Sequence, residues 1–146
     1  MSCTAPSDTI RVLIVEDNPV DLFIIQEALR GGGVHHEQIA VNDGEPALQI
    51  LRREAPYENE PAPDLVILDL NLRRVDGREV LSYIRSTKGL SDTTVAIVSS
   101  SPAEAVHAEE LGADCYIRKP SNLDAFLAIG KTIWHCYLDK AERGYV

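Results

Sequence analysis

The sequence predicts an α/β fold in which a parallel β-sheet carries helices on both faces. Patterns typical of strands and of helices alternate about five times along the chain, which is the signature of such a layered fold. Four short runs are apolar and rich in β-branched residues, as expected of buried strands: Val12–Val15, Leu65–Leu68, Val95–Val98 and Tyr116–Arg118. The 146 residues fit one domain that can bury a core without metal or disulfide support.

The first half of the chain predicts two strands and two helices. Ile10–Val15 has the composition of a buried strand. Pro19 suits the first turn of a helix that reaches about Arg30, where three consecutive glycines end it. Gln38–Val41 is a weaker second strand, and Asn42–Gly44 supplies a turn and a cap for a second helix. That helix has an apolar stripe formed by Ala47, Leu48 and Leu51.

The middle of the chain predicts a surface loop, a strand and a helix. Three prolines and several acidic residues between Glu54 and Asp64 indicate a loop on the surface. The third strand, Leu65–Asp69, is followed by a loop that Asp76-Gly77 closes, and the third helix then runs to about Thr87.

The last part predicts two strands and two helices. The fourth strand covers about Val95–Ser99, and the fourth helix begins near Pro102 and ends at Gly112. Cys115–Arg118 is the fifth strand. One final helix begins at Asn122 and carries apolar and aromatic residues at helical spacing: Leu123, Phe126, Leu127, Ile133, Trp134 and Tyr137. We expect an N-terminal leader over 1–9, a single domain over 10–140 and a tail over 141–146.

Composition excludes several classes of protein. The formal net charge is 14 − 23 = −9, so the surface repels nucleic acid and anionic lipid on average. The three cysteines have no metal-ligand spacing and their number is odd, which argues for a reducing compartment. No run has the length of a membrane span, and the start of the chain lacks a signal-peptide pattern. We expect a cytoplasmic protein that binds neither nucleic acid nor membrane.

Polar residues follow the predicted strands at the point where each one ends. They are Glu16 and Asp17 after the first, Asp69 after the third, Ser99 after the fourth and Lys119 after the fifth. Because the carboxyl ends of parallel strands open onto one crevice, these side chains are expected to meet. Three carboxylates, a hydroxyl and an ammonium in one crevice predict metal-assisted phosphate chemistry.

The order of these residues closely resembles the receiver domain of bacterial two-component response regulators, from Arg11 to about Leu138. The pattern comprises the acidic pair, Asp-x-Asn-x5-Gly from Asp69 to Gly77, then Ser99 and the Lys119-Pro120 pair. The resemblance implies a flavodoxin-like receiver fold, a five-stranded parallel sheet of order 2-1-3-4-5 with five helices. The Leu-Arg-Arg-Glu and Asp-Gly-Arg-Glu-Val-Leu segments and the aromatic last helix are similar to single-domain regulators that work with bacterial phytochrome kinases.

The resemblance implies that Asp69 accepts a phosphoryl group from a phosphohistidine on a sensor histidine kinase. Magnesium would be bound by Asp17, Asp69 and the backbone carbonyl of Asn71, and by Glu16 mostly through a coordinated water. These are hard oxygen ligands, and the cation would offset the repulsion between a carboxylate and a phosphoryl group.

Further roles follow from the same resemblance. Lys119, Ser99 and backbone N–H groups near Leu70 and Ser100 would contact the phosphoryl oxygens. Ser99 and Tyr116 would form a switch that couples the site to the surface of the fourth helix, fifth strand and last helix. Asn71 and Ser101 would influence the lifetime of the phosphorylated state. The Lys119–Pro120 peptide bond would be cis.

Simpler interpretations stand beside these. Glu16, Asp17 and Asn18 are also suited to cap the first helix. Tyr116 taken alone fits an ordinary half-buried strand residue, and Trp134 and Tyr137 fit the core. Ile129 and Cys136 fall outside the core stripe of the last helix, which suggests a homodimer through the face of the fourth helix, fifth strand and last helix. One departure from the family pattern is Arg73, where receivers commonly have proline.

The sequence as a whole favours a single-domain response regulator that is not an enzyme and signals by phosphorylation-dependent protein binding. Its partners would be the kinase, possibly a bacteriophytochrome, and a downstream protein or a histidine phosphotransfer protein. One alternative is a receiver-like module that binds without phosphorylation. Another is a phosphohydrolase that uses an aspartyl phosphate, but Asn71 stands where that class has its second acid.

Overall fold

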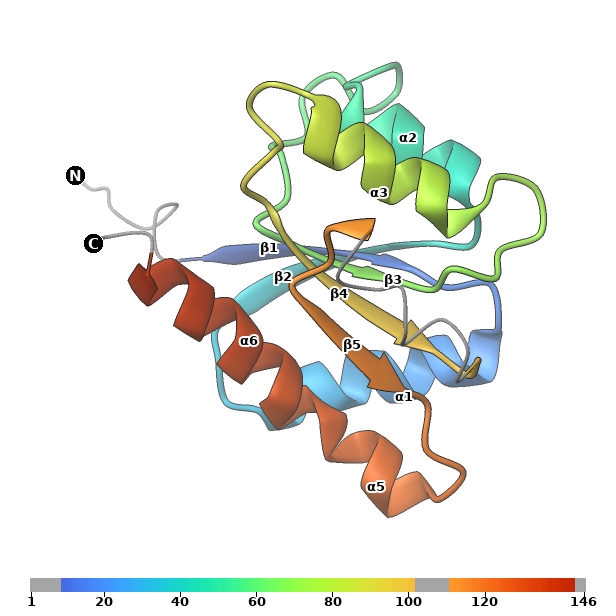
Figure 1. Cartoon of the computed structure of the whole chain (residues 1–146), viewed down its shortest axis with the longest axis vertical. Helices are drawn as coiled ribbons and strands as arrows, with labels where there is room; N and C mark the ends of the chain where they lie inside the picture. Colours follow the sequence, from blue (N-terminus) through green and yellow to red (C-terminus); the bar gives the residue numbers. More distant parts are fainter. Residues whose placement is uncertain (1–8, 102–110, 144–146) are drawn as a thin grey trace.

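A five-stranded parallel sheet forms the centre of the molecule (Figure 1). The computed structural model describes residues 9–101 and 111–143. The strand order is β2-β1-β3-β4-β5, so the predicted fold class and topology are confirmed. The strands are β1 (Ile10–Val15), β2 (His36–Val41), β3 (Leu65–Leu68), β4 (Thr94–Ser99) and β5 (Cys115–Arg118).

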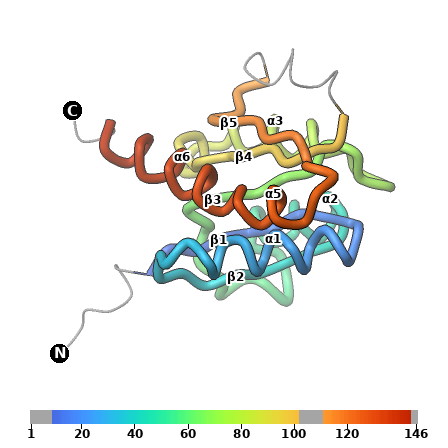
Figure 2. The backbone as a smooth tube through the Cα atoms, turned by 90° about the horizontal axis from the view of Figure 1, so that it is seen from below, coloured from blue at the N-terminus to red at the C-terminus, as the bar shows by residue number. Residues whose placement is uncertain are grey.

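Helices pack on both faces of the sheet (Figures 1 and 2). Of the helices within the described residues, two cover one face, α2 (Gly44–Leu51) and α3 (Gly77–Ser86). Three cover the other face, α1 (Pro19–Gly31), α5 (Leu123–Leu127) and α6 (Ile129–Arg143). The fourth helix expected from Pro102 onward falls mostly outside the described residues.

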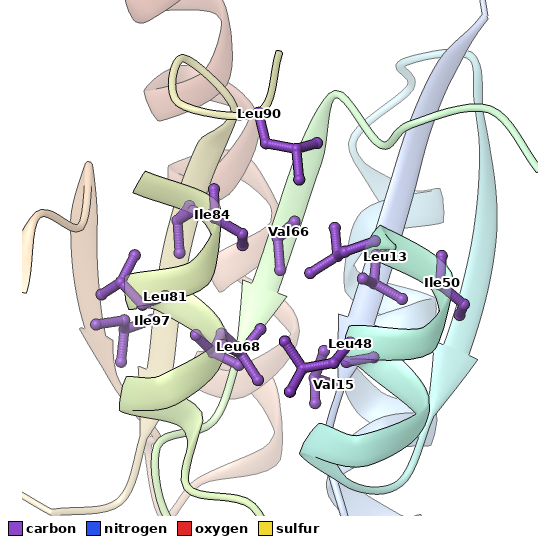
Figure 3. Packing of buried hydrophobic residues seen from close by; sticks show 14 of the residues in the cluster. Leu13, Val15, Leu48, Ile50, Val66, Leu68, Leu81, Ile84, Leu90 and Ile97 are labelled. Carbon is purple, nitrogen blue, oxygen red and sulfur yellow. The ribbon is translucent and has the colours of Figure 1, made fainter. Parts of the chain in front are cut away.

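Alternate residues of the central strands enter two separate cores. Leu13 and Val15 of β1 pack with α2 and α3 in the core that Figure 3 shows in close-up. Val12 and Ile14 point the other way and pack with residues of α1, α5 and α6. Since successive side chains of a strand point to opposite faces, both sets are buried and the strand has no polar face. The strand ends are consequently where polar side chains can be placed.

Side-chain caps start the helices where the sequence predicts. Pro19 is the first residue of α1, and Asn18 Oδ1 accepts hydrogen bonds from the backbone N–H groups of Val20 and Asp21. The capping interpretation of Asn18 is therefore confirmed. Asp43 caps α2 through the N–H of Gly44.

Asp43 also holds the loop that follows the site residue Asn71. Its carboxylate accepts hydrogen bonds from the backbone N–H groups of Arg74 and Val75 at 3.2 and 3.1 Å. Desolvation opposes the charged form, but the bonds from Val75, Gly44 and Arg74 outweigh it, so the pKa of Asp43 lies below its usual value of 3.8.

We expect Asp43→Ala to lower the free energy of unfolding by about 1 kcal/mol near neutral pH, the typical cost of a lost N-cap. Because folding lowers the pKa of this carboxyl, its charge stabilises the fold above the unfolded value and the stabilisation is lost as pH falls through the folded value. Urea titrations of both proteins near neutral pH and near pH 3 measure the effect. A stability difference that stays constant between the two pH values would contradict the assigned role of the charge.

The last helix differs from the prediction in two respects. The sequence predicted one helix from Asn122, whereas the hydrogen-bond pattern is interrupted at Ala128 and separates α5 from α6. Ile129, which was placed outside the core stripe, is in fact buried with Phe126 and Trp134. The interruption changes which residues face the sheet, so a single helical stripe drawn through both segments assigns Ile129 wrongly.

Gly130 allows α6 to pack directly on the backbone of α1. A Cβ atom at this position would lie 2.0 Å from the carbonyl oxygen of Ala28. We expect Gly130→Ala to lower the free energy of unfolding by about 1–3 kcal/mol, because the two backbones must separate. The matched control is Gly31→Ala, where a Cβ meets nothing within 4 Å. Chemical denaturation of both variants measures the difference, and equal stabilities would contradict the close contact.

Candidate functional site

The predicted site residues lie together at the carboxyl edge of the sheet. Glu16 and Asp17 directly follow β1, Asp69 follows β3, Ser99 is the last residue of β4 and Lys119 follows β5. Backbone bonds continue between the strand ends: Asp69 N–H donates to Val15, and Lys119 N–H donates to Ser99. The parallel topology therefore brings together residues more than one hundred positions apart.

The Lys119 ammonium is the centre of the site. Its Nζ atom lies 2.9 Å from Glu16 Oε1, 2.9 Å from Asp21 Oδ2 and 3.1 Å from Asp69 Oδ2, and its side chain is 9% exposed. Burial by itself would lower the pKa of Lys119, but the hydrogen bonds to Asp21 and Glu16 and the nearby negative charges raise it above the usual value. Lys119 is therefore a fixed cation that holds three carboxylates.

The sequence analysis missed Asp21. This residue lies in the first turn of α1, on a helix rather than at a strand end, so the rule of converging strand ends does not find it. Its position two residues after Pro19 was the available signal, because an acidic side chain in a first helical turn lies near the strand-end crevice in this fold class.

Glu16 is the most deeply buried carboxylate of the site, at 1% exposure. Burial raises its pKa to about 7, the bond with Lys119 acts in the opposite direction, and the charge of Asp69 raises it further. Its second oxygen, Oε2, accepts a hydrogen bond of 3.1 Å from the backbone N–H of Asn18. Glu16 thus contacts both the ammonium and the residue that caps α1.

Asp69 is 5% exposed, and a contact to each carboxylate oxygen orients its side chain. Oδ1 accepts a 3.0 Å hydrogen bond from the backbone N–H of Asn71, and Oδ2 faces Lys119. The loop after Asp69 returns close to it, since a Cβ atom at Gly77 would lie 2.4 Å from the Asp69 carbonyl oxygen. Only glycine permits this approach, which accounts for the Asp-x-Asn-x5-Gly spacing.

A chain of hydrogen bonds joins the end of β4 to Tyr116 of β5. Ser99 is fully buried, and its Oγ accepts bonds from Asn71 Nδ2 at 3.4 Å and from the backbone N–H of Ser101 at 3.3 Å. The Tyr116 hydroxyl donates to the carbonyl oxygen of Ser101. The two predicted switch residues are therefore connected through one residue.

The carboxylates suit a divalent cation. Glu16, Asp17 and Asp69 each offer one oxygen, and these oxygens lie within 4.8 Å of one another. With Asp21 the cluster has four carboxylates, of which Lys119 contacts three and Arg73 lies beside the fourth, Asp17, so the cluster keeps an excess of negative charge. Hard oxygen donors with excess negative charge are what divalent cations such as Mg²⁺ or Mn²⁺ bind.

Two further observations concern the surroundings of the site. Arg73 Nε lies 3.8 Å from Asp17 Oδ2, and the Arg73 side chain is largely exposed, as expected for a solvated loop cation. Among the described residues the cis peptide bond is Ala55–Pro56, so the expectation of a cis Lys119–Pro120 bond was wrong. An X–Pro bond favours the trans form by about 0.5–1 kcal/mol. Lys119 makes its contacts with the carboxylates while its bond to Pro120 is trans.

Comparison with known proteins agrees with this geometry. A family model described as the response regulator receiver domain matches residues 12–130. The chain belongs to this family. This receiver is 39% identical to response regulator Rcp1 of Synechocystis sp. over 114 residues, which are 77% of this chain and 78% of Rcp1.

Solved structures extend the comparison. The phosphorylated cyanobacterial phytochrome response regulator RcpA has a TM-score of 0.82 and 41% identity, covering 89% of this receiver and 94% of RcpA. The Mn²⁺-bound form of Rcp1 has a TM-score of 0.79 and 35% identity, covering 85% of this receiver and 91% of Rcp1. The resemblance to phytochrome-associated single-domain regulators is thus confirmed.

Other relatives are longer. This receiver spans 42% of the alkaline phosphatase synthesis transcriptional regulatory protein PhoP of Bacillus subtilis, with 31% identity over 110 residues. Among the described residues, none of the helices combines the length and apolar character that crossing a bilayer requires.

Proposed function

We propose that this receiver accepts a phosphoryl group from a sensor histidine kinase on Asp69 and signals by binding other proteins in the phosphorylated state. The observation that carries the proposal is the Asp69 carboxylate, buried, oriented by Asn71 and Lys119, and grouped with Glu16 and Asp17. In the transfer, the phosphorus–nitrogen bond of the phosphohistidine breaks and a phosphorus–oxygen bond to Asp69 forms.

The proposed cofactor is Mg²⁺, held by Asp17, Asp69 and the backbone carbonyl of Asn71, with Glu16 acting through a coordinated water. When bound, it supplies positive charge that offsets the repulsion between the carboxylate and the incoming phosphoryl group. The fit of the carboxylate oxygens supports this assignment.

Two side chains would stabilise the transferred group. Lys119 already faces Asp69, since its ammonium lies 3.1 Å from Oδ2. It would therefore contact a phosphoryl oxygen without movement of a strand or helix. Ser99 Oγ would approach the phosphoryl group from the end of β4. Because Ser99 contacts Ser101 and Ser101 contacts Tyr116, movement of Ser99 would be transmitted to β5. Asn71 and Ser101 are the residues proposed to influence the phosphorylated lifetime.

The proposed partners follow from the phosphoacceptor role. Relatives named as phytochrome response regulators support a bacteriophytochrome as the kinase. The output would be a downstream protein, a histidine phosphotransfer protein or a second copy bound through the β5 and α6 surface, and the site of action would be the cytoplasm. We propose a signalling role rather than an enzymatic one, because Asn71 provides an amide where a phosphohydrolase of this type needs an acid.

The test is labelling with acetyl phosphate. We expect one phosphoryl group per chain when Mg²⁺ is present and none when the cation is chelated, detected as a mass increase of the intact protein. Trapping the acyl phosphate and mapping the peptides should place it on Asp69. An adduct on another residue, or the absence of an adduct with both acetyl phosphate and a cognate kinase, would contradict the proposal.

A further inference from the structure

Lys119 holds one carboxylate that the proposed transfer does not use. Asp21 Oδ2 accepts a 2.9 Å hydrogen bond from Lys119 Nζ, although the two residues are 98 positions apart in the sequence. The carboxylates grouped closely enough for a divalent cation, among the residues that the structure describes, do not include Asp21. The contact between Asp21 and Lys119 therefore needs an explanation other than metal binding.

The Lys119 ammonium is already surrounded by carboxylates before a phosphoryl group arrives. A lysine ammonium has three N–H donors, and three carboxylate oxygens lie at 2.9, 2.9 and 3.1 Å from Lys119 Nζ. Burial lowers the pKa of Lys119, and the hydrogen bond to Asp21 is the largest of the effects that raise it. An incoming phosphoryl oxygen must therefore take the place of one carboxylate before it can contact the ammonium.

Asp21 is the carboxylate that can be displaced at the least cost. Its side chain is 24% exposed, against 1% for the Glu16 side chain and 6% for that of Asp69. Asp21 borders a cavity of about 420 Å³ that Lys119 and Ser100 also line, so water can replace the ammonium as its partner. Displacing Glu16 would leave a buried charge without its cation, which is costly, and Asp69 must stay oriented to act as the nucleophile.

We propose that Asp21 is a positioning residue that competes with the phosphoryl group for Lys119. In the unphosphorylated protein Asp21 holds the ammonium in place, and it gives way when a phosphoryl oxygen reaches Lys119. The competition lowers the affinity of the site for the phosphoryl group and returns the ammonium to its place once that group is lost. The inference rests on the proposed transfer to Asp69, in which the bond from phosphorus to the leaving group breaks and a bond from phosphorus to the carboxylate oxygen forms.

The first measurement is the rate of phosphoryl uptake by the full chain from acetyl phosphate, well below saturation with the donor and at saturating Mg²⁺. Asp21→Asn keeps the shape of the side chain and removes the competing charge. Uptake should become about tenfold faster, a factor between the effects of an exposed ion pair and of a buried one. If Asp21 served only to hold Lys119 in its productive position, the same substitution would slow uptake, so the sign of the change decides between the two roles.

Matched variants separate this competition from a general effect of charge. Asp21→Glu retains the carboxylate and should restore the slower uptake. Glu27→Gln removes a partly exposed carboxylate from the same helix, where it pairs with Arg30, and should leave the rate within about twofold of the unmodified protein. In about 1 M KCl the Debye length falls to about 3 Å, which screens long-range attraction of the anionic donor. The faster uptake of Asp21→Asn should persist there, because a direct contact with Lys119 is screened much less.

Binding of beryllofluoride, BeF₃⁻, gives a second readout that needs no group transfer. This anion bonds to a carboxylate oxygen with the shape of a phosphoryl group, and titration followed by ¹⁹F NMR should show tighter binding to Asp21→Asn than to the unmodified protein. An unchanged or weaker response in either measurement, equal acceleration by Asp21→Glu, or loss of the difference at high salt would each overturn the proposal. Tighter beryllofluoride binding by Asp21→Asn without labelling of the unmodified protein would support the competition and contradict the transfer to Asp69, so the two failures are distinguishable.

Discussion

Asp69→Asn is expected to abolish phosphoryl uptake from acetyl phosphate, reducing it to the background of untreated protein. The asparagine amide keeps the shape of the side chain but is not a nucleophile toward phosphorus. We expect no other carboxylate of the cluster to replace it, because Asp69 is the one oriented by both the Asn71 backbone N–H and Lys119. Intact-protein mass spectrometry after incubation with acetyl phosphate and Mg²⁺ measures the adduct.

The same substitution should weaken binding of divalent cations. It removes one of three carboxylates whose oxygens lie within 4.8 Å of one another, so affinity should fall by more than the about 10–100-fold typical of losing an outer partner. Calorimetric titration with Mn²⁺ measures this change. The control is Asp64→Asn, an exposed carboxylate at the opposite edge of the sheet, which should retain both properties. Full labelling of Asp69→Asn would refute the assignment of the acceptor.

Lys119→Gln is expected to slow phosphoryl uptake by about 10²–10³-fold, the usual cost of removing one fixed donor from a charge-developing site. Glutamine retains a hydrogen-bond donor but is one atom shorter, so the loss combines the positive charge facing Asp69 with a shorter reach. The rate of adduct formation at saturating Mg²⁺ gives the comparison. Arg118→Gln removes the adjacent, exposed cation and should leave the rate within about twofold of the unmodified protein, since exposed charges contribute little.

Lys119→Gln should also destabilise the metal-free protein. Removing one partner of a buried ion pair typically costs about 3–5 kcal/mol, and the partial exposure of Asp21 keeps the expected loss below that range. Added Mg²⁺ should recover part of the loss, because it also offsets the charge of the remaining carboxylates. Denaturation curves with and without Mg²⁺ measure both effects. Unchanged stability without metal would mean that Lys119 does not hold the cluster together.

The site residues at strand ends could be predicted because parallel topology alone brings them together. Asp17, Asp69 and Lys119 need only the strand assignments to be placed in one crevice, and all three lie there. Asp21 could not be found in this way, since its contact with Lys119 depends on the rotation of α1 about its axis. That rotation is set by packing between side chains, which periodicity does not reveal.

The carboxyl-terminal helices show a second limit. Whether a helical pattern is one helix or two depends on how closely each turn approaches its neighbours. Gly130 packs against the backbone of Ala28, and α5 before it is a separate helix. Ile129 is therefore buried, where a continuous helical stripe would expose it.

Asn18 links the site directly to the first turn of α1. Its N–H donates to Glu16 while its side chain closes the first turn of α1. A ligand that draws Glu16 into a fixed position must therefore also steady the beginning of this helix. The amide protons of Val20 and Asp21 would then exchange with solvent more slowly when a cation is bound. Binding of a cation at the edge of the sheet would thus make the first turn of a helix on the outer surface more rigid.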